Sequence, residues 1–379
     1  MRVLVVNAGS SSLKLNVLEP DDRVAADRDL DSPAGRPDLD ALDEFVREAG
    51  ELDVSVHRLV HGGDEFRESC VVDDDATERL EALGELAPLH NRAALAALRR
   101  IRELRPELPA VACFDTAFHS TLSPGASVYA IPYEWTERFD VHRFGFHGLS
   151  HAYASRRAAQ MLGREPEGLR VVTCHLGAGA SLAAVRDGRS VDTTMGFTPL
   201  DGLVMATRCG SIDPGAVLWL VNRAGISVKE VGAVLTRDSG LLGISGVSGD
   251  MREVLAAADE GNERARLALD VYLHRLRGAI ASMAAATGGL DALVFTAGVG
   301  ERSARIRAEA CAGLAFLGVA LDEAANADPE RPDGEVSTPG AAVRTLVVEA
   351  REDLETAREA RRVLGADTGL DERAESHRG

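Results

Sequence analysis

Three glycine-containing turns each follow an apolar, strand-like run, and their composition suits the binding of phosphate. They span residues 7–12, 175–181 and 297–300. Backbone N–H groups in such turns, with serine hydroxyls beside them, form concavities that bind anions, and glycine lets a phosphate approach the backbone closely. Each turn alone is more often an ordinary tight turn. The three together predict a nucleotide held between two lobes, without the P-loop or G-x-G-x-x-G patterns, which the chain lacks.

Arginine and histidine residues supply a second group of candidates. Arg58 and Arg208 lie in strand-end segments far apart in the sequence and are suited to clamp an anion from opposite lobes. His147 lies in a glycine-containing segment, 144–151, that is poorly suited to a helix interior and well suited to face a substrate. The histidines show no zinc-binding spacing, so we predict no metal ligation by histidine.

The composition limits the classes of function. The chain has 379 residues, which suggests two domains or one large α/β unit, and its formal net charge of -18 repels nucleic acids and anionic lipids. No apolar stretch reaches the roughly 20 residues of a membrane span, and the N-terminus shows no signal-peptide pattern, so we expect a cytoplasmic protein without nucleic-acid or membrane partners. The five cysteines are scattered and predict neither a disulfide framework nor a zinc site.

The elements that must position these residues form two similar series. Residues 2–18 are typical of a strand, a polar turn and a second strand, and residues 170–185 repeat this pattern. Two such hairpins, each heading alternating strands and helices, predict a duplicated α/β architecture. We predict further strands at 54–60, 110–114, 293–296 and 341–348, helices at 39–49, 76–105 with a break at 88–91, 267–286, 305–314 and 354–364, a loop at 21–40, a glycine turn at 297–300 and a solvated tail at 367–379.

Five motifs together resemble the acetate kinase family. They are Asn7–Lys14, His57–Gly63, Phe114–His119, Gly145–His151 and Thr198–Gly210, and the match runs in order from Val3 to about Arg362. The wider group of acetate, propionate and butyrate kinases shares several of these motifs. The resemblance implies the duplicated two-domain fold shared with sugar kinases, Hsp70 and actin, with a cleft between the lobes. It also implies a homodimer built through the second domain, one lobe from residues 1–119 plus 354–379, and a nucleotide-binding lobe from 120–353.

The resemblance also implies a role for individual residues. It assigns Arg58, Asp115, His147 and Arg208 to the catalytic centre, with His90 and His175 nearby, and makes His147 and Arg208 the stabilisers of the transition state. It places Val60, Leu89, Phe146 and Pro199 against the methyl group of acetate. It places Asn7 and Glu352 beside Mg²⁺ or Mn²⁺. The implied nucleotide site comprises Ser10, Ser12, Lys14, His175, Leu176, Gly177, Ala178, Gly179, Asp250, Met251, Arg252, Gly298, Val299, Gly300 and Arg302.

Three positions depart from the family pattern. Ala178 and Arg302 stand where the family usually has asparagine, and Arg351-Glu352-Asp353 stands where it usually has Asn-Glu-Glu. The first change removes an amide from the phosphate side, and the second adds a cation near the nucleotide. These changes bear on nucleotide preference and on the metal assignment of Glu352.

The implied reaction is reversible, Mg²⁺-dependent transfer of the γ-phosphoryl group of ATP to acetate, giving acetyl phosphate and ADP. Acetate is already an anion at neutral pH, so the reaction needs aligned cations rather than a strong base. Asp115 could orient an arginine or hold a metal-bound water, and the sequence leaves both roles open. Three alternatives also stay open: a propionate kinase, a relative that uses pyrophosphate, and a non-catalytic or filament-forming member of the superfamily.

Overall fold

The computed structural model describes residues 1–9, 12–32, 36–85, 88–328 and 333–365, with the side chains of residues 85 and 88–90 left out. The chain packs as two compact units. The first contains Met1–Ser120, His147–Tyr153 and the chain from Arg351 onward, and the second contains Thr121–Phe146 and Ala154–Ala350. The first unit therefore includes a short segment, His147–Tyr153, that the sequence had not assigned to it.

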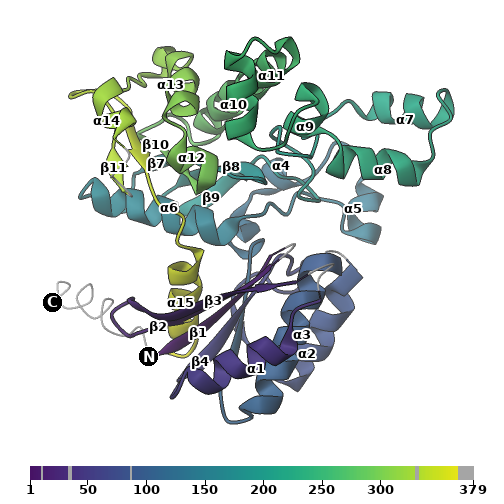
Figure 1. Cartoon of the computed structure of the whole chain (residues 1–379), viewed down its shortest axis with the longest axis vertical. Coiled ribbons are helices and arrows are strands. Elements are labelled where there is room, and N and C mark those ends of the chain that lie inside the picture. The colour runs from purple at the N-terminus through teal and green to yellow at the C-terminus, as the bar shows by residue number, and fades with distance from the viewer. Residues whose placement is uncertain (10–11, 33–35, 86–87, 329–332, 366–379) are drawn as a thin grey trace. The chain divides into compact units, whose positions relative to one another are not determined.

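The first unit is built on a six-stranded sheet with the order β3-β2-β1-β4-β6-β5. Its strands are β1 (Val3–Ala8), β2 (Ser12–Leu18), β3 (Val24–Asp31), β4 (Val54–Leu59), β5 (Cys70–Val71) and β6 (Ala110–Phe114). Strands β1, β4 and β6 are parallel, while β2, β3 and β5 pair antiparallel. Both faces are covered, because α1 (Leu39–Glu48) and α3 (Pro88–Leu104) pack on one side and α15 (Glu352–Val363) on the other (Figure 1). Burial on both faces explains why β1 and β6 are mostly apolar.

The second unit repeats this topology. Its strands are β7 (Arg170–Leu176), β8 (Ala180–Arg186), β9 (Arg189–Thr193), β10 (Ala292–Thr296), β11 (Gly334–Glu335) and β12 (Arg344–Val347). They form the order β9-β8-β7-β10-β12-β11, with β7, β10 and β12 parallel and the others antiparallel. This order matches that of the first sheet strand for strand, so the predicted duplication of the α/β fold is confirmed.

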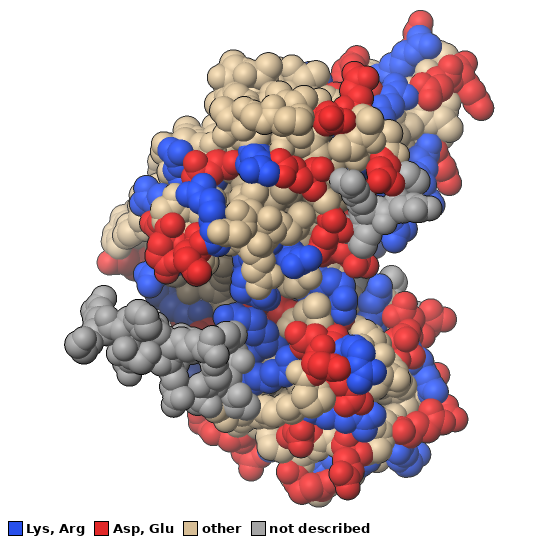
Figure 2. Space-filling view, turned by 90° about the vertical axis from the view of Figure 1, so that its left-hand side faces the viewer, with Lys and Arg blue, Asp and Glu red and all other residues tan. Residues whose placement is uncertain are grey.

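The remaining helices mostly have ten residues or fewer, although α6 and α11 are longer. They are α2 (Asp74–Ala82), α4 (Pro124–Ser127), α5 (Tyr133–Phe139), α6 (Gly148–Met161), α7 (Pro214–Asn222), α8 (Val228–Arg237), α9 (Gly240–Ser245), α10 (Met251–Asp259), α11 (Glu263–Ala286), α12 (Ala297–Arg302), α13 (Ala304–Ala312) and α14 (Glu323–Ala327). Among the described residues, no helix is both long and apolar enough to cross a membrane. All five cysteines are free thiols. On the face drawn in Figure 2, acidic and basic side chains are interspersed over the surface of each unit.

Three local predictions are wrong, each for a physical reason. Residues 21–40 are not all loop, because Val24–Asp31 forms the edge strand β3, whose exposed polar residues conceal its pairing with β2. The predicted glycine turn at 297–300 is the start of helix α12. The predicted break at 88–91 is the first turn of α3, where proline is well tolerated because the first helical N–H groups need no partner within the helix.

Candidate active site and nucleotide pocket

Arg58 is the centre of a polar cluster at the carboxyl edge of the first sheet. Asn7 and Arg58 are register partners on the parallel strands β1 and β4, so their side chains share a face, and Asp115 directly follows β6. The Nε and Nη2 atoms of Arg58 donate to the two carboxylate oxygens of Asp115 at 2.9 and 2.5 Å. Its Nη1 donates to the amide oxygen of Asn7 at 2.8 Å. The carboxyl ends of parallel strands are the usual place for ligands in such sheets.

Glu352 completes the cluster from the first turn of α15. Its Oε2 accepts a hydrogen bond from Asn7 Nδ2 at 3.3 Å and lies 3.9 Å from Arg58 Nε. Burial by itself lowers the pKa of Arg58, but the carboxylates of Asp115 and Glu352 outweigh this effect and raise it. Arg58 is therefore a fixed cation, and three of its five N–H groups are engaged in these hydrogen bonds. The other two form no hydrogen bond with a described residue.

The paired hydrogen bonds between Arg58 and Asp115 favour one of the two roles that the sequence left open for Asp115. Both carboxylate oxygens hold the guanidinium, and the side chain of Asp115 is buried. Two parallel hydrogen bonds fix the plane of an arginine as well as its position. The geometry is that of a residue that orients Arg58.

His147 reaches the same cluster through the backbone. Its N–H donates to the Asp115 carboxylate, and the N–H of Gly148 donates to the Asp115 carbonyl oxygen at 2.9 Å. A Cβ atom at residue 148 would collide with that carbonyl, so only glycine allows the approach. His147 itself has a left-handed φ of 57°, an uncommon conformation for a non-glycine residue that often marks functional sites. The ring of buried His151 lies 6.5 Å from that of His147, measured between centroids.

Arg208, in the second unit, is a half-buried cation without a counter-ion. Its Nη1 donates to the carbonyl oxygen of Pro199 at 3.1 Å, and it forms no ion pair with any described residue. Burial lowers the pKa of this guanidinium, and no carboxylate among the described residues offsets the loss of water. An unpaired, partly desolvated arginine is suited to receive a small anion.

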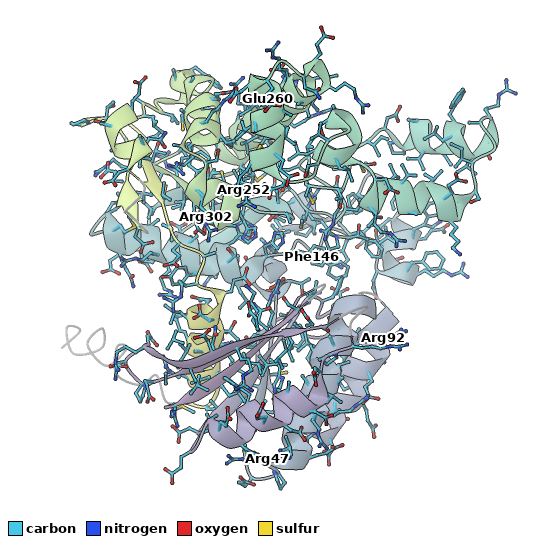
Figure 3. The ribbon with its side chains drawn as sticks, in the orientation of Figure 1. Arg47, Arg92, Phe146, Arg252, Glu260 and Arg302 are labelled. Atoms are coloured by element: carbon cyan, nitrogen blue, oxygen red, sulfur yellow. The ribbon has the colours of Figure 1, made fainter. Side chains whose placement is uncertain are left out.

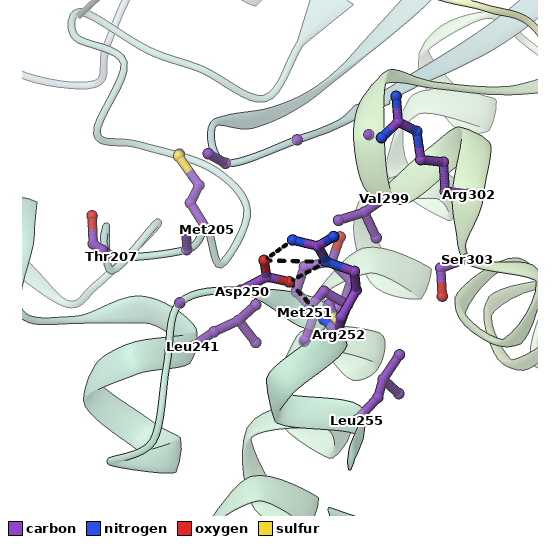
Figure 4. A pocket seen from close by; sticks show the side chains of 16 residues that line it. Met205, Thr207, Leu241, Asp250, Met251, Arg252, Leu255, Val299, Arg302 and Ser303 are labelled. Atoms are coloured by element: carbon purple, nitrogen blue, oxygen red, sulfur yellow. Dashed lines mark hydrogen bonds and ion pairs between the residues drawn. The ribbon is translucent and has the colours of Figure 1, made fainter. Parts of the chain in front are cut away.

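The second unit also contains a cavity of about 790 Å³, drawn in Figure 4. Eight of the predicted nucleotide residues line it: Gly177, Ala178, Asp250, Met251, Arg252, Gly298, Val299 and Arg302. The sequence missed Met205, Ala206, Thr207, Leu241, Gly249, Leu255, Tyr272 and Ser303. Most of these are small or apolar and look like ordinary core, although Thr207 and Ser303 adjoin the singled-out residues Arg208 and Arg302.

Two arginines flank the cavity in different ways (Figures 3 and 4). Arg252 is held by Asp250, whose pKa its guanidinium lowers to about 2. Arg302 lies on α12, is exposed, and forms no ion pair or side-chain hydrogen bond with another described residue. Gly298 leaves open space where a Cβ would stand, so the mouth of the cavity is unobstructed there.

The other predicted nucleotide residues do not line this cavity. His175 is half-buried on β7, and a Cβ at Gly177 would lie 3.7 Å from its Nε2. The rest occupy varied positions: Leu176 and Gly300 are buried, Gly179 closes a turn with Gly177, Lys14 is exposed on β2, Ser12 begins β2, and Ser10 lies outside the described residues.

The predicted acyl-pocket residues are distributed over both units. Val60 and Phe146 are buried, and Pro199 lies in the segment between β9 and α7. Leu89 falls in the first turn of α3, but its side chain and that of His90 lie outside the described part of the structure.

Comparison with known proteins supplies the deciding observation, because the model of the Acetokinase family matches residues 38–358. The chain belongs to the acetokinase family. It is 49% identical to the acetate kinase of Nostoc punctiforme over 82% of this chain and 76% of that protein. The crystal structure of Porphyromonas gingivalis acetate kinase matches with a TM-score of 0.89, 35% identity, and coverage of 96% of this chain and 99% of that chain. A propionate kinase from Francisella tularensis matches with a TM-score of 0.86, 36% identity, and coverage of 94% and 98%.

Membership of the family confirms three predictions made from the motifs: the resemblance itself, the two-unit duplicated α/β fold, and an enzyme that transfers a phosphoryl group to a carboxyl group. The roles of individual residues stay predictions.

Proposed function

We propose that this chain is an acetate kinase that transfers the γ-phosphoryl group of ATP directly to acetate. A carboxylate oxygen of acetate forms the new P–O bond, the bond from the γ-phosphorus to the β–γ bridging oxygen breaks, and ADP leaves with that electron pair. No proton must be removed from the nucleophile, because acetate is ionised at neutral pH. The protein must align two mutually repelling anions and offset their charge.

The observation that carries the proposal is Arg208, a half-buried guanidinium that no described carboxylate neutralises. Leaving a cation partly desolvated is costly unless an anion completes it. We assign acetate and the transferring phosphoryl group as those anions, with Pro199 as part of the wall beside the methyl group. Arg58 contributes its two remaining N–H groups to the same anions, in the orientation that Asp115 gives it.

His147 is proposed to donate a hydrogen bond to the transferring phosphoryl group as its charge develops. Its backbone is fixed on Asp115, which ties its position to that of Arg58. A donor held in place in advance stabilises the transition state without reorganisation during the reaction.

The 790 Å³ cavity supports a nucleotide rather than pyrophosphate as the donor. Apolar side chains such as Leu241, Met251 and Leu255 offer contacts to a base and ribose but nothing to a bare pyrophosphate. Gly177 and Gly298 lie at its edge, where a polyphosphate can approach the backbone. A pyrophosphate-using enzyme has no need of such a cavity.

Mg²⁺ fits the donor set formed by Asn7 and Glu352. The Glu352 carboxylate lies 3.3 Å from Asn7 Nδ2, and the amide oxygen of Asn7 accepts from Arg58, so Glu352 would be the first ligand and Asn7 would add its oxygen only after its amide turns. Magnesium is usually held by one or two carboxylates together with substrate phosphates and water, so this pair is sufficient. When bound, the ion offsets charge on the nucleotide phosphates. Glu352 would supply the charged ligand and Asn7 a neutral one.

A homodimer through the second unit is part of the proposal. Helix α7 carries no charged residue and buries none of its side chains within the unit, leaving Leu218 and Trp219 62% and 60% exposed. Neighbouring α8 exposes Val228. Such a cluster suits burial against a second copy. Size-exclusion chromatography with light scattering would give a dimer mass, and Trp219→Glu would shift it toward the monomer.

We also infer a cytoplasmic location, which ATP as donor and five free thiols support.

The test is a panel of acceptors and donors. Acetate, propionate and butyrate are each combined with ATP, GTP and pyrophosphate, with Mg²⁺ present, and the acyl phosphate is trapped as its hydroxamate. The proposal expects the highest kcat/KM for acetate with ATP. Preference for propionate would make the chain a propionate kinase, preference for pyrophosphate would overturn the donor assignment, and no acyl phosphate from any pair would overturn the function.

A further inference from the structure

Two side chains that the proposed chemistry does not use, Tyr129 and Arg143, lie together in the second unit. Their segments run antiparallel, because Val128 and His142 form a β-bridge and the Arg143 N–H donates to the Ser127 carbonyl oxygen at 2.8 Å. The guanidinium carbon of Arg143 lies 5.8 Å from the centre of the Tyr129 ring. The two side chains form one cluster, held by a cation–π contact.

This cluster holds the segment that leads to Pro199. Arg143 Nη1 donates to three successive carbonyl oxygens, of Thr193, Thr194 and Met195, at 3.1, 3.1 and 2.8 Å. The Tyr129 hydroxyl accepts a hydrogen bond from the Phe197 N–H at 2.8 Å. Residues 194–213 form no helix or strand, so their backbone groups depend on partners of this kind. A long segment without regular structure inside a packed unit is commonly functional.

The same cluster joins this segment to the one that carries Phe146. The Gly196 carbonyl oxygen accepts from the N–H groups of Phe144 and Gly145 at 3.2 and 3.3 Å. A Cβ at residue 196 would collide with the Tyr129 hydroxyl, so glycine is required for the segments to come this close. Pro199 is three residues from Gly196, and Phe146 directly follows Gly145, which is hydrogen-bonded to Gly196.

We propose that Tyr129 and Arg143 are positioning residues that set the separation of Phe146 and Pro199, and with it the preference for a short acid. The inference rests on the proposed function, in which these two residues face the methyl group of acetate. Neither Tyr129 nor Arg143 touches the substrate. Their effect passes through the backbone of residues 193–197, and Pro199 passes it on to Arg208 through its carbonyl oxygen.

The decisive variant is Tyr129→Phe, which removes one hydroxyl and keeps the ring under Arg143. The Phe197 N–H then loses its partner, and the segment that carries Pro199 gains freedom to move away from Phe146. We expect the acetate KM to rise about three- to tenfold, the scale of one lost hydrogen bond, and the ratio of kcat/KM for acetate over propionate to fall by a similar factor. The KM for ATP should stay within about twofold.

Tyr133→Phe is the matched control. Tyr133 lies on α5 and is 62% exposed, and its side chain forms no hydrogen bond or ring contact with another described residue. Its loss of a hydroxyl should change neither the acid ratio nor any KM. A purely structural role for Tyr129 would lower the folded fraction and the apparent kcat but leave the acid ratio unchanged, and that result would overturn the inference.

Two substitutions of Arg143 test the inference independently. Lysine at this position keeps a cation with three N–H donors for the three carbonyl oxygens, whereas methionine keeps only the stem. We expect Arg143→Lys to stay within about threefold of the wild-type acetate KM and Arg143→Met to exceed it about tenfold. Equal effects of the two variants would contradict the inference. If the wild type forms acetyl phosphate and Tyr129→Phe has the same ratio of kcat/KM for acetate over propionate as the wild type, only this inference is refuted. If the wild type uses no carboxylic acid, the proposed function is refuted and the inference with it.

Discussion

The orientation of Arg58 by Asp115 leads to a prediction about Asp115→Asn. Asparagine keeps the shape of the side chain but offers one oxygen in place of two, and its amide group would face a guanidinium N–H. Two hydrogen bonds, at 2.9 and 2.5 Å, are therefore reduced to one. Breaking a buried ion pair costs about 3–5 kcal/mol when no partner remains. Arg58 keeps Asn7 at 2.8 Å and Glu352 at 3.9 Å, so we expect about half of that loss in the free energy of unfolding.

In Asp115→Asn, kcat should fall by more than the loss of folded protein accounts for. If the two remaining N–H groups of Arg58 must point at the phosphoryl oxygens, a guanidinium free to rotate loses most of its effect, and removal of one aimed donor typically costs about 10²-fold in turnover. The assay is hydroxamate trapping of acetyl phosphate, with kcat corrected for the folded fraction measured by urea unfolding.

The same unit offers a matched control in Asp43 and Arg100. The Asp43 carboxylate accepts from Arg100 Nε and Nη2 at 2.7 and 2.5 Å, the same forked geometry, but between α1 and α3, far in the sequence from the strand ends. Asp43→Asn should destabilise the protein and leave kcat and both KM values unchanged. If Asp115→Asn keeps corrected turnover within about twofold of wild type, or if Asp43→Asn loses as much, the orienting role of Asp115 is refuted.

Four further outcomes are expected. Arg208→Ala should lower turnover by about 10² to 10⁴ with the fold intact, and near-normal acetyl phosphate formation would remove Arg208 from the site. His147→Ala should lower kcat more than it raises the acetate KM, since its donor acts mainly in the transition state; a change in KM alone would make it a binding residue. Val60→Ala should raise kcat/KM for propionate relative to acetate, and an unchanged ratio means that Val60 does not line the acyl pocket. Burial lowers the pKa of His57 from 6.5 to about 3, so the unfolded chain binds more protons between these values and stability should fall as pH drops through that window; His57→Asn should flatten the pH dependence of urea unfolding.

The sequence predicts those parts of the site that lie at the ends of strands. Asn7 and Asp115 each follow an apolar run and Arg58 lies near the end of a strand, and parallel strands bring their carboxyl ends to one edge, so the sequence alone implies that these residues meet. The paired hydrogen bonds between Asp115 and Arg58, which favour an orienting role for Asp115, are invisible in the sequence because they depend on the plane of a guanidinium. Helix α12 was mistaken for a turn because its glycines lower helix propensity, while packing against β7 and β10 holds the helix together.

Contacts made by one long side chain to backbone carbonyls are the hardest to predict. Arg143 bonds the carbonyl oxygens of residues 193–195, and any residue type there would offer the same acceptors. The only trace in the sequence is Gly196, whose missing Cβ makes room for the Tyr129 hydroxyl. Gly196→Ala should therefore have the same direction of effect as Tyr129→Phe, because both separate the segment from the cluster that holds it. Membership of the family establishes that the acceptor is a carboxylate. We expect the choice among short acids to depend on how firmly residues 194–213, which form no helix or strand, are held in place.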